Sequence, residues 1–228
     1  MATVLVTGAN KGVGLDLTKR YAARGDTVLA CCRNADAAAD LNAIPENVEV
    51  HEVQISDGAS VAALADAVGD RPIDLLINNA GMAGPPPNLQ SGTDMDFDGW
   101  AETFAVNTMA PLRILQTFRD NLKAGTEPKA VTITSQMGAL DLNWPLMYAY
   151  CSSKAAVNKV MRMMSAELVG DGIAVVLIHP GHVKTDMGGP NAEITPEESG
   201  AGIVDVIDNT TIETTGTFMK WNGEPHNW

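Results

Sequence analysis

The sequence predicts an α/β protein, a doubly wound, seven-stranded and mainly parallel sheet with helices on both faces. Short apolar runs alternate with helix-period segments through most of the 228 residues, and such alternation builds a parallel sheet through right-handed crossovers. A glycine-rich turn follows the first apolar run directly, as a turn between a first strand and a first helix does. No linker, repeat or low-complexity tract interrupts the pattern, so we expect residues 1–228 to form one domain.

Strands are expected where apolar and β-branched residues cluster, and helices where apolar residues recur every three or four positions. The predicted strands are Thr3–Thr7, Thr27–Cys31, Val48–Val53, Ile73–Ile77, Ala130–Thr134, Ala174–Ile178 and a short edge strand near Thr217–Lys220. The predicted helices are Leu15–Arg24, Ser60–Val68, a long Trp100–Leu122 and Tyr148–Val169. Loops at about residues 82–96, 136–147 and 181–197 follow strands. Ligands bind outside the carboxyl ends of such strands, so we expect these loops to border a substrate.

The composition excludes several classes of partner. With 45% hydrophobic and 19% charged residues the chain has the balance of an ordered globular protein. A formal net charge of -13 argues against a nucleic-acid or anionic membrane surface. No apolar run approaches the roughly 20 residues that cross a bilayer, and an initial strand leaves no room for a signal peptide. We therefore expect a cytoplasmic protein that acts on a small molecule.

The cysteines do not suggest a disulfide framework. Cys31, Cys32 and Cys151 form an odd and sparse set, which is not the pattern of a disulfide-rich secreted domain. Cys31 and Cys32 end an apolar strand, where small core residues are expected. A redox role for the vicinal pair is the alternative.

The first turn has the residues of a dinucleotide site. Gly8, Gly12 and Gly14 lie in Thr-Gly-Ala-Asn-Lys-Gly-Val-Gly, between the first strand and the first helix. Glycines let backbone N–H groups approach a pyrophosphate at a helix N-terminus, as in Rossmann-type folds. The spacing differs from G-x-G-x-x-G, and an ordinary glycine-rich loop is the alternative. The position at the junction of strand and helix favours the binding site.

A tyrosine and a lysine with helical spacing suggest proton chemistry. Tyr150 and Lys154 are four residues apart in a predicted helix, so their side chains lie on one face. An ammonium beside a phenol favours the phenolate and lowers a pKa that is about 10 in water. A phenol tuned in this way could exchange a proton with a carbinol.

The order of these motifs resembles the short-chain dehydrogenase/reductase family over nearly the whole chain. The motifs are the glycine-rich turn, Asn78-Asn79-Ala80-Gly81, Asn107 in a helix, Ser135 after a strand, Tyr150 with Lys154, and Pro180-Gly181-His182-Val183-Lys184-Thr185. Four short sequence segments are similar to the C-factor-like branch of that family: those at Trp100, residues 179–181, residues 185–189 and residues 221–223. Six motifs in one order are far more specific than any single motif.

The resemblance implies an oxidoreductase that transfers a hydride between a nicotinamide and a carbonyl or secondary alcohol. Tyr150 would be the acid/base, and Lys154 would bind the nicotinamide ribose and favour the tyrosinate. Ser135 would orient the substrate oxygen, and Asn107 would support a water chain from Lys154. The residues expected to bind the cofactor are Gly8, Asn10, Lys11, Gly12, Val13, Gly14, Arg33, Gln54, Ile55, Asn79, Ala80, Gly81, Tyr150, Lys154, Pro180, Gly181, Val183 and Thr185.

The end of the second strand indicates which nicotinamide is bound. NAD-binding proteins usually carry an acid there for the ribose 2′-OH, whereas Arg33 follows Cys32 in this chain. Arg33 and Lys11 could bind a 2′-phosphate, so NADP(H) is expected in preference to NAD(H). The alternative is two solvated surface cations. Gln54 is a candidate adenine contact, and Ser56 or Asp57 is expected to cap a helix.

The spacing of the catalytic residues departs from the family's pattern. The interval from Ser135 to Tyr150 is slightly longer than usual, and Tyr148 lies closer to the usual interval. Tyr148 has Ser152 rather than a lysine four residues on, so Tyr150 is assigned the acid/base role and Tyr148 a packing role. The loop from Gly138 to Met147, between Ser135 and Tyr150, can absorb two extra residues at little entropic cost.

The substrate pocket is expected to be apolar and adaptable, and to suit a hydrophobic ketone or aldehyde. Its candidate lining residues are Met82, Met137, Trp144, Met147, His182 and Met187. The alternative is that several of them pack under loops. His179 and His182 have no third ligand nearby in the sequence, so no metal is expected.

Two other functions stay open at this point. One is a sensor or signalling protein that binds the cofactor without turnover, which loss of Tyr150 or Lys154 would have favoured. The other is a lyase similar to halohydrin dehalogenases, which lack the glycine-rich turn that is intact here. The resemblance implies a homodimer or homotetramer, and a monomer stays open.

Overall fold

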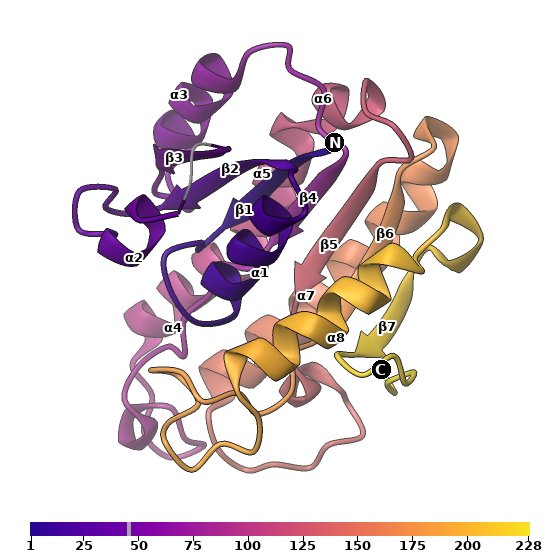
Figure 1. The fold of residues 1–228 in the computed structure, drawn as a ribbon. Helices are drawn as coiled ribbons and strands as arrows, with labels where there is room; N and C mark the ends of the chain where they lie inside the picture. The colour runs from indigo at the N-terminus through magenta and orange to yellow at the C-terminus, as the bar shows by residue number, and fades with distance from the viewer. Residues whose placement is uncertain (45–46) are drawn as a thin grey trace.

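The computed structural model of this chain describes residues 1–44 and 47–228. Over these residues seven strands form one sheet in the order β3-β2-β1-β4-β5-β6-β7, and every neighbouring pair is parallel. The predicted doubly wound sheet and its short final edge strand are therefore confirmed (Figure 1). The strands are β1 (Thr3–Thr7), β2 (Thr27–Cys32), β3 (Val48–Glu52), β4 (Leu75–Asn78), β5 (Lys129–Ile133), β6 (Ala174–His179) and β7 (Thr217–Lys220).

Helices cover both faces of the sheet, because alternate residues of each strand are buried on opposite sides. Val4 and Val6 pack with α1 (Gly12–Ala23), the short α2 (Ala39–Asn42) and α8 (Pro196–Asp208), whereas Leu5 packs on the other side. That side is covered by α3 (Gly58–Val68), α5 (Ala110–Thr117) and α7 (Tyr148–Leu168). The result is a three-layer molecule with two apolar cores, one on each face (Figure 1).

The direction of winding reverses at β1. The chain proceeds from β1 outward to β2 and β3, and then returns to place β4 on the other side of β1. The loops after β1 and β4 therefore leave the same edge of the sheet in opposite directions. A crevice forms at such a switch point, outside the carboxyl ends of the strands. This position is where the glycine-rich turn and the Asn79–Gly81 segment meet.

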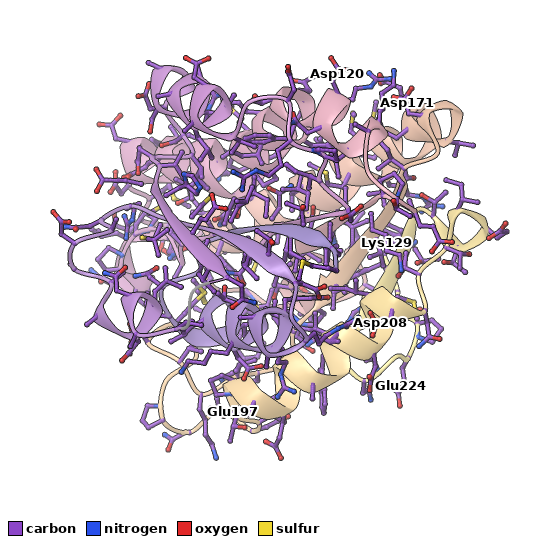
Figure 2. The ribbon with its side chains drawn as sticks, turned by 45° about the horizontal axis from the view of Figure 1, so that its top comes forward. Asp120, Lys129, Asp171, Glu197, Asp208 and Glu224 are labelled. Carbon is purple, nitrogen blue, oxygen red and sulfur yellow. The ribbon has the colours of Figure 1, made fainter. Side chains whose placement is uncertain are left out.

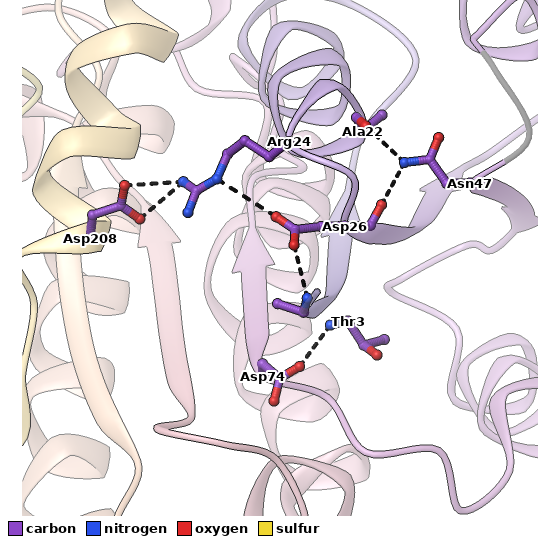
Figure 3. A network of polar contacts seen from close by, with 8 residues as sticks. Thr3, Ala22, Arg24, Asp26, Asn47, Asp74 and Asp208 are labelled. Carbon is purple, nitrogen blue, oxygen red and sulfur yellow. Dashed lines mark hydrogen bonds and ion pairs between the residues drawn. The ribbon is translucent and has the colours of Figure 1, made fainter.

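A polar network holds the opposite, amino edge of the sheet (Figure 3). Arg24, just after α1, pairs with Asp208 at the end of α8 at 3.0 Å and lies 3.7 Å from Asp26. Asp26 accepts the backbone N–H of Ala2 at 2.8 Å, and Asp74 accepts that of Thr3 at 2.7 Å. These contacts join α1, α8 and the starts of β1, β2 and β4 at the end of the molecule remote from the crevice.

The predicted long helix over Trp100–Leu122 is interrupted. It begins earlier, as α4 (Phe97–Phe104), passes through a π-helical turn at Ala105–Met109 and continues as α5 and α6 (Arg119–Lys123). Pro111 explains the widened turn, because it has no N–H to donate and its ring would clash with the carbonyl four residues earlier, that of Asn107. The region predicted to be helical is therefore helical, but it is not one continuous helix, and the irregular turn that carries Asn107 was not predicted.

Helix α8 was not predicted, and the expected loop over residues 181–197 overlaps its first turn. The signal was present: Thr195 accepts the N–H of Glu198 at 3.2 Å, and Glu198 accepts that of Thr195 at 2.8 Å. This reciprocal capping box, with Pro196 at the first helical position, marks a helix start. Ile203, Val206 and Ile207 then have the spacing of a buried helix face.

Charged side chains lie around the outside of this layered core. Figure 2 shows the labelled Asp120, Asp171, Glu197 and Glu224 near its outline, where they contribute to the net charge of -13. Lys129 donates to the carbonyls of Ile207 and Asp208 at 2.7 and 3.3 Å, and so places a cation at the C-terminus of α8. Within the two described stretches, none of the helices combines the length and hydropathy needed to span a bilayer.

The α8 cap gives a stability prediction. Thr195→Ala removes the acceptor for Glu198 and should lower the free energy of unfolding by about 1 kcal/mol, measured by urea denaturation. Thr211→Ala is the matched control, because it removes the same motif from a turn of only three residues, Ile212–Thr214. Equal losses in the two variants would contradict a specific role of the cap in holding α8.

Candidate active site

Tyr150 and Lys154 lie on one face of the first two turns of α7, as their spacing predicts. Both side chains are buried, with 8% and 5% of their surfaces exposed. The Lys154 Nζ atom lies 5.8 Å from the centroid of the Tyr150 ring and donates to the carbonyl of Ile133 at 3.1 Å. The ammonium therefore approaches the ring and the end of β5 together.

Burial controls the protonation of both groups. It raises the pKa of Tyr150, against a smaller lowering by the hydrogen bond with the Ser135 hydroxyl. It lowers the pKa of Lys154 to about 8. The expectation that Lys154 would lower the pKa of Tyr150 is wrong for this structure, because loss of hydration favours the neutral form of each group more strongly.

Ser135 follows β5 and faces the same volume. Its Oγ accepts the N–H of Met137 at 3.1 Å and so begins the short turn Gln136–Gly138. A Cβ on Gly138 would lie 2.7 Å from the backbone carbon of Lys154, so this glycine lets the turn pack directly on α7. The close packing brings the serine to the tyrosine despite the longer loop between them.

Asn158 holds this junction and was not identified from the sequence. Its Oδ1 accepts the Thr134 hydroxyl at 2.6 Å, and its Nδ2 donates to the Gly138 carbonyl at 3.4 Å. Asn158 stands four residues after Lys154, on the same helical face. That spacing was the signal that could have identified it.

Asn107 connects the segment after β4 with α7. Its amide donates to the carbonyl of Met82 at 2.8 Å, and its carbonyl oxygen accepts the Met82 N–H at 2.9 Å. The same amide donates to Ser153 Oγ at 3.0 Å. A Cβ on Gly81 would lie 3.2 Å from Asn107 Oδ1 and 3.6 Å from Lys154 Nζ. The backbone of Gly81 therefore lies beside the side chains of both Asn107 and Lys154.

The glycine-rich turn and the Asn79–Gly81 segment form one hydrogen-bonded unit. Asn79 Nδ2 donates to the carbonyls of Thr7 and Gly8 at 3.0 and 3.1 Å. The Thr7 hydroxyl in turn accepts the N–H groups of Asn79 and Ala80 at 3.0 and 3.1 Å. Gly8 has a φ of 67°, and a Cβ on it would lie 2.9 Å from Ala80 Cα, so both backbone conformation and space require glycine here.

The N-terminus of α1 suits an anion. No side chain caps it, and its first turn holds no acidic residue. By contrast, Asp57, Asp96 and Thr195 cap α3, α4 and α8 with their own side chains. A glycine-rich turn leading to an uncapped helix is the arrangement that receives the pyrophosphate of a dinucleotide, so these residues fit one. The capping role expected for Asp57 is confirmed.

The two cations expected at the 2′-phosphate differ in their surroundings. Lys11 Nζ lies 2.7 Å from Asp186 Oδ2, and both side chains are exposed. A Cβ on the adjacent Gly12 would lie 3.0 Å from Thr185 Cγ2, so the loop after β6 lies against this turn. Arg33 is exposed and makes no ion pair with any residue the structure describes. Arg33 is thus the cation still available, whereas Lys11 already has a partner.

The segment expected at the adenine is anchored by its own contacts. Gln54 Nε2 donates to the Ser56 hydroxyl at 3.0 Å. Arg113 donates to the carbonyls of Ile55 and Ser56 at 3.2 and 2.8 Å. The side chain of Ile55 is buried. This segment therefore follows β3 in a fixed conformation.

The residues expected to line the substrate pocket are only partly covered. Met82, Met137 and Met147 are half-buried, whereas Trp144 and Met187 are 53% and 51% exposed. His182 is exposed and pairs with the Gly188 carbonyl of its own loop at 3.0 Å. A groove of about 800 Å³ lies elsewhere, between α8 and β7, and none of the expected site residues lines it. That groove is therefore separate from the candidate site around Tyr150.

The comparisons with known proteins agree with this geometry. The sequence model of the short chain dehydrogenases matches residues 2–195. The chain belongs to the short-chain dehydrogenase family. Within this family, C-signal of Myxococcus xanthus is 40% identical over 167 residues, which cover 73% of this chain and 99% of that protein.

Two further relatives of this short-chain dehydrogenase match over its full length. The 1-hydroxy-2-glutathionyl-2-methyl-3-butene dehydrogenase of Rhodococcus sp. (strain AD45) is 35% identical over 235 residues, covering 100% of both chains. The crystal structure of NADPH-bound carbonyl reductase from chicken fatty liver has a TM-score of 0.90 at 30% identity, covering 100% of this chain and 99% of that one. The expected family and its relation to the C-factor-like branch are confirmed.

The burial of Lys154 gives a stability prediction with a defined pH dependence. A pKa lowered from 10.5 to about 8 corresponds to a cost of about 3 kcal/mol for burying the ammonium. Lys154→Met removes that cost and the hydrogen bond to Ile133, so it should raise the free energy of unfolding at pH 7 by about 1–3 kcal/mol.

The direction in which stability changes with pH depends on whether the folded or the unfolded chain keeps the proton of Lys154. Below pH 8 both folded and unfolded wild type are protonated, and the burial cost is fully present. Between about pH 8 and 10.5 only the unfolded chain keeps the proton, so wild-type stability rises with pH. The advantage of Lys154→Met in denaturant melts should shrink across this window, and a constant difference would exclude a buried titrating lysine.

Proposed function

We propose that this short-chain dehydrogenase is an NADP(H)-dependent oxidoreductase that interconverts a carbonyl and a secondary alcohol. The observation that carries the proposal is the convergence of Ser135, Tyr150 and Lys154, with the Lys154 ammonium beside the backbone of Gly81. The three side chains come from the end of β5 and from α7, and the segment with Gly81 adjoins the glycine-rich turn through Asn79. An acid/base, a substrate-orienting hydroxyl and a dinucleotide site thus share one crevice.

The cofactor would supply or accept the hydride at the carbonyl carbon. In reduction, Tyr150 donates the phenolic proton to the carbonyl oxygen, while the Ser135 hydroxyl donates a hydrogen bond to the same oxygen. Burial raises the pKa of Tyr150 and keeps the phenol protonated, as a general acid requires. In oxidation, Tyr150 first passes its phenolic proton to the neutral amine of Lys154, and the phenolate then accepts the proton of the alcohol.

Lys154 and Asn107 would support the proton transfer by Tyr150. The pKa of Lys154 is about 8, so its amine can exchange protons near neutral pH and return one to the tyrosine. It would also donate to the ribose hydroxyls of the nicotinamide. Asn107 would support a water chain to solvent, and its bonds to Met82 and Ser153 hold it in position for that role.

The preference for NADP(H) is proposed from Arg33. It follows β2 directly, it is exposed, and the position carries no acid to bind a ribose 2′-OH. The NADPH-bound carbonyl reductase from chicken fatty liver supports the same choice by analogy. Lys11 would contribute only when the phosphate competes with Asp186 for its ammonium.

The substrate is proposed to be a small, hydrophobic carbonyl or alcohol at loops 82–96, 136–147 and 181–197. The exposed Trp144 and Met187 and the half-buried Met147 offer an apolar and adaptable lining. We further propose one domain, a homodimer or homotetramer, and a cytoplasmic location. The free thiols of Cys31, Cys32 and Cys151 suit a reducing compartment.

A second candidate function is cofactor binding without turnover. The relative named C-signal, at 40% identity, favours a signalling role. The presence of Tyr150 and Lys154 in a buried, hydrogen-bonded arrangement favours catalysis. NADPH binding together with no oxidation of NADPH across a panel of aldehydes, ketones and diketones would support the second candidate.

Tyr150→Phe should abolish NADPH-dependent carbonyl reduction, by about 10³-fold or more, because it removes the phenol whose ring lies 5.8 Å from Lys154 Nζ. NADPH binding, followed by fluorescence titration, should survive. Tyr148→Phe is the control, since that side chain is 40% exposed at the start of the same helix and should leave kcat within about 3-fold of wild type. If Tyr150→Phe kept its activity and Tyr148→Phe lost it, the acid/base would be Tyr148 and not Tyr150.

Arg33→Ala should weaken NADPH binding by about 10- to 100-fold and leave NADH binding nearly unchanged, because the lost charge-assisted hydrogen bonds address the 2′-phosphate alone. Arg71→Ala makes the same change of net charge at a residue that pairs with Glu49 instead. This control should alter neither affinity in a binding titration. Equal losses for NADPH and NADH in Arg33→Ala would exclude phosphate recognition by Arg33.

A further inference from the structure

The N-terminus of α7 is capped by a residue from another part of the chain. Met147, which precedes the helix, has a φ of 55° and provides no side-chain cap. Instead, the N–H of Tyr148 donates to the backbone oxygen of Gln90 at 3.3 Å. The N–H of Tyr150 donates to Gln90 Oε1, also at 3.3 Å. The first turn of the helix that carries Tyr150 is therefore bonded to the loop after β4.

The Gln90 amide makes three hydrogen bonds, through both N–H donors and its oxygen. Its Nε2 donates to the carbonyl of Ala83 at 3.0 Å and to that of Pro85, while its Oε1 accepts from Tyr150. Only 1% of the residue is exposed. A buried amide with both donors and its acceptor engaged holds a single orientation, and removing it leaves buried carbonyls and an N–H without partners.

The loop that Gln90 holds is continuous with the segment beside the expected nicotinamide. Ala83 follows Met82, whose backbone is bonded at both its N–H and its carbonyl by Asn107. Gly84 lies against the helices, since a Cβ there would be 2.8 Å from Thr103 Oγ1 and 3.5 Å from Ala149 Cβ. Gln90 thus connects the backbone around Gly81–Met82 with the turn that carries Tyr150, by a path separate from Asn107 and Ser153.

We propose that Gln90 is a positioning residue for catalysis, which fixes the distance between the Tyr150 phenol and the cofactor segment after β4. Its bond goes to the N–H of Tyr150 itself, so a displacement of the loop or of the amide moves the acid/base directly. Proton transfer is sensitive to such displacement, because a misplacement of about 1 Å can cost about 10²-fold in rate. The proposal rests on the proposed oxidoreductase function.

The test compares three variants by steady-state kinetics with NADPH and a carbonyl. Gln90→Met keeps the length of the side chain and removes its polar atoms, whereas Gln90→Glu keeps the acceptor and loses the amide donors. Asn121→Leu is the matched control. The Asn121 amide also donates to two backbone carbonyls, those of Gly69 and Arg71 at 2.7 and 2.8 Å, far from the site.

Gln90→Met should lower kcat by about 10- to 100-fold, while KM for NADPH stays within about 3-fold. Asn121→Leu should lower the melting temperature similarly and leave kcat unchanged. Gln90→Glu should recover part of the activity, and more as the pH falls, because a buried carboxyl has a raised pKa and regains one donor when protonated. Wild-type kcat in Gln90→Met, or an equal loss in Asn121→Leu, would overturn the proposal.

Amide hydrogen exchange makes the outcome independent of turnover. The peptide over residues 147–152 should exchange faster in Gln90→Met than in wild type, and should be unchanged in Asn121→Leu. If wild type itself reduces no carbonyl, the proposed function fails, and exchange still decides whether Gln90 holds Tyr150. Unchanged protection of this peptide in Gln90→Met would then overturn the positioning role as well.

Discussion

The hydrogen bonds between Asn79 and the turn after β1 are the interaction on which the rest of the site depends. They join the carboxyl ends of β1 and β4 at the point where the winding of the sheet reverses. Gly81 and Met82 then reach Asn107, and Asn107 reaches α7 through Ser153. Together with the bonds of the Thr7 hydroxyl to the N–H groups of Asn79 and Ala80, this link holds the glycine-rich turn against the segment that leads to the helix carrying Tyr150.

Helix α7 contacts the surrounding segments through one buried face. Tyr150, Lys154 and Asn158 follow each other at intervals of four residues, and they contact the loop after β4, the end of β5 and the turn that begins at Ser135. The same burial that orders these groups removes their hydration. The protonation of the site is therefore set by the fold as a whole rather than by the tyrosine and lysine as an isolated pair.

The sequence predicted what depends on periodicity and on local motifs. The strands, the order of the motifs and the cap at Asp57 follow from residues close together in the chain, and the structure agrees with them. Other features arise only when distant segments meet. Asp186 lies 175 residues from its partner Lys11, and Gln90 is 60 residues from Tyr150. Helix α8 is a different case, because the capping box at Thr195 can be recognised in the sequence and the helix was nevertheless not predicted.

The π-helical turn at Ala105–Met109 restricts how this chain can change during evolution. Such a turn contains one residue more than a turn of regular α-helix. Deleting a single residue there would close the turn to a regular α-helix and leave the residues after it near their present orientation, with Ile114 and Leu115 still in the core. Pro111 would then follow a regular turn, where its ring clashes with the carbonyl four residues earlier and its missing N–H leaves that carbonyl without a donor. Asn107, inside the turn, would lose the position from which it contacts Met82 and Ser153. The extra residue is thus retained by two independent demands, a proline that a regular turn does not accept and an asparagine that joins two segments of the candidate site.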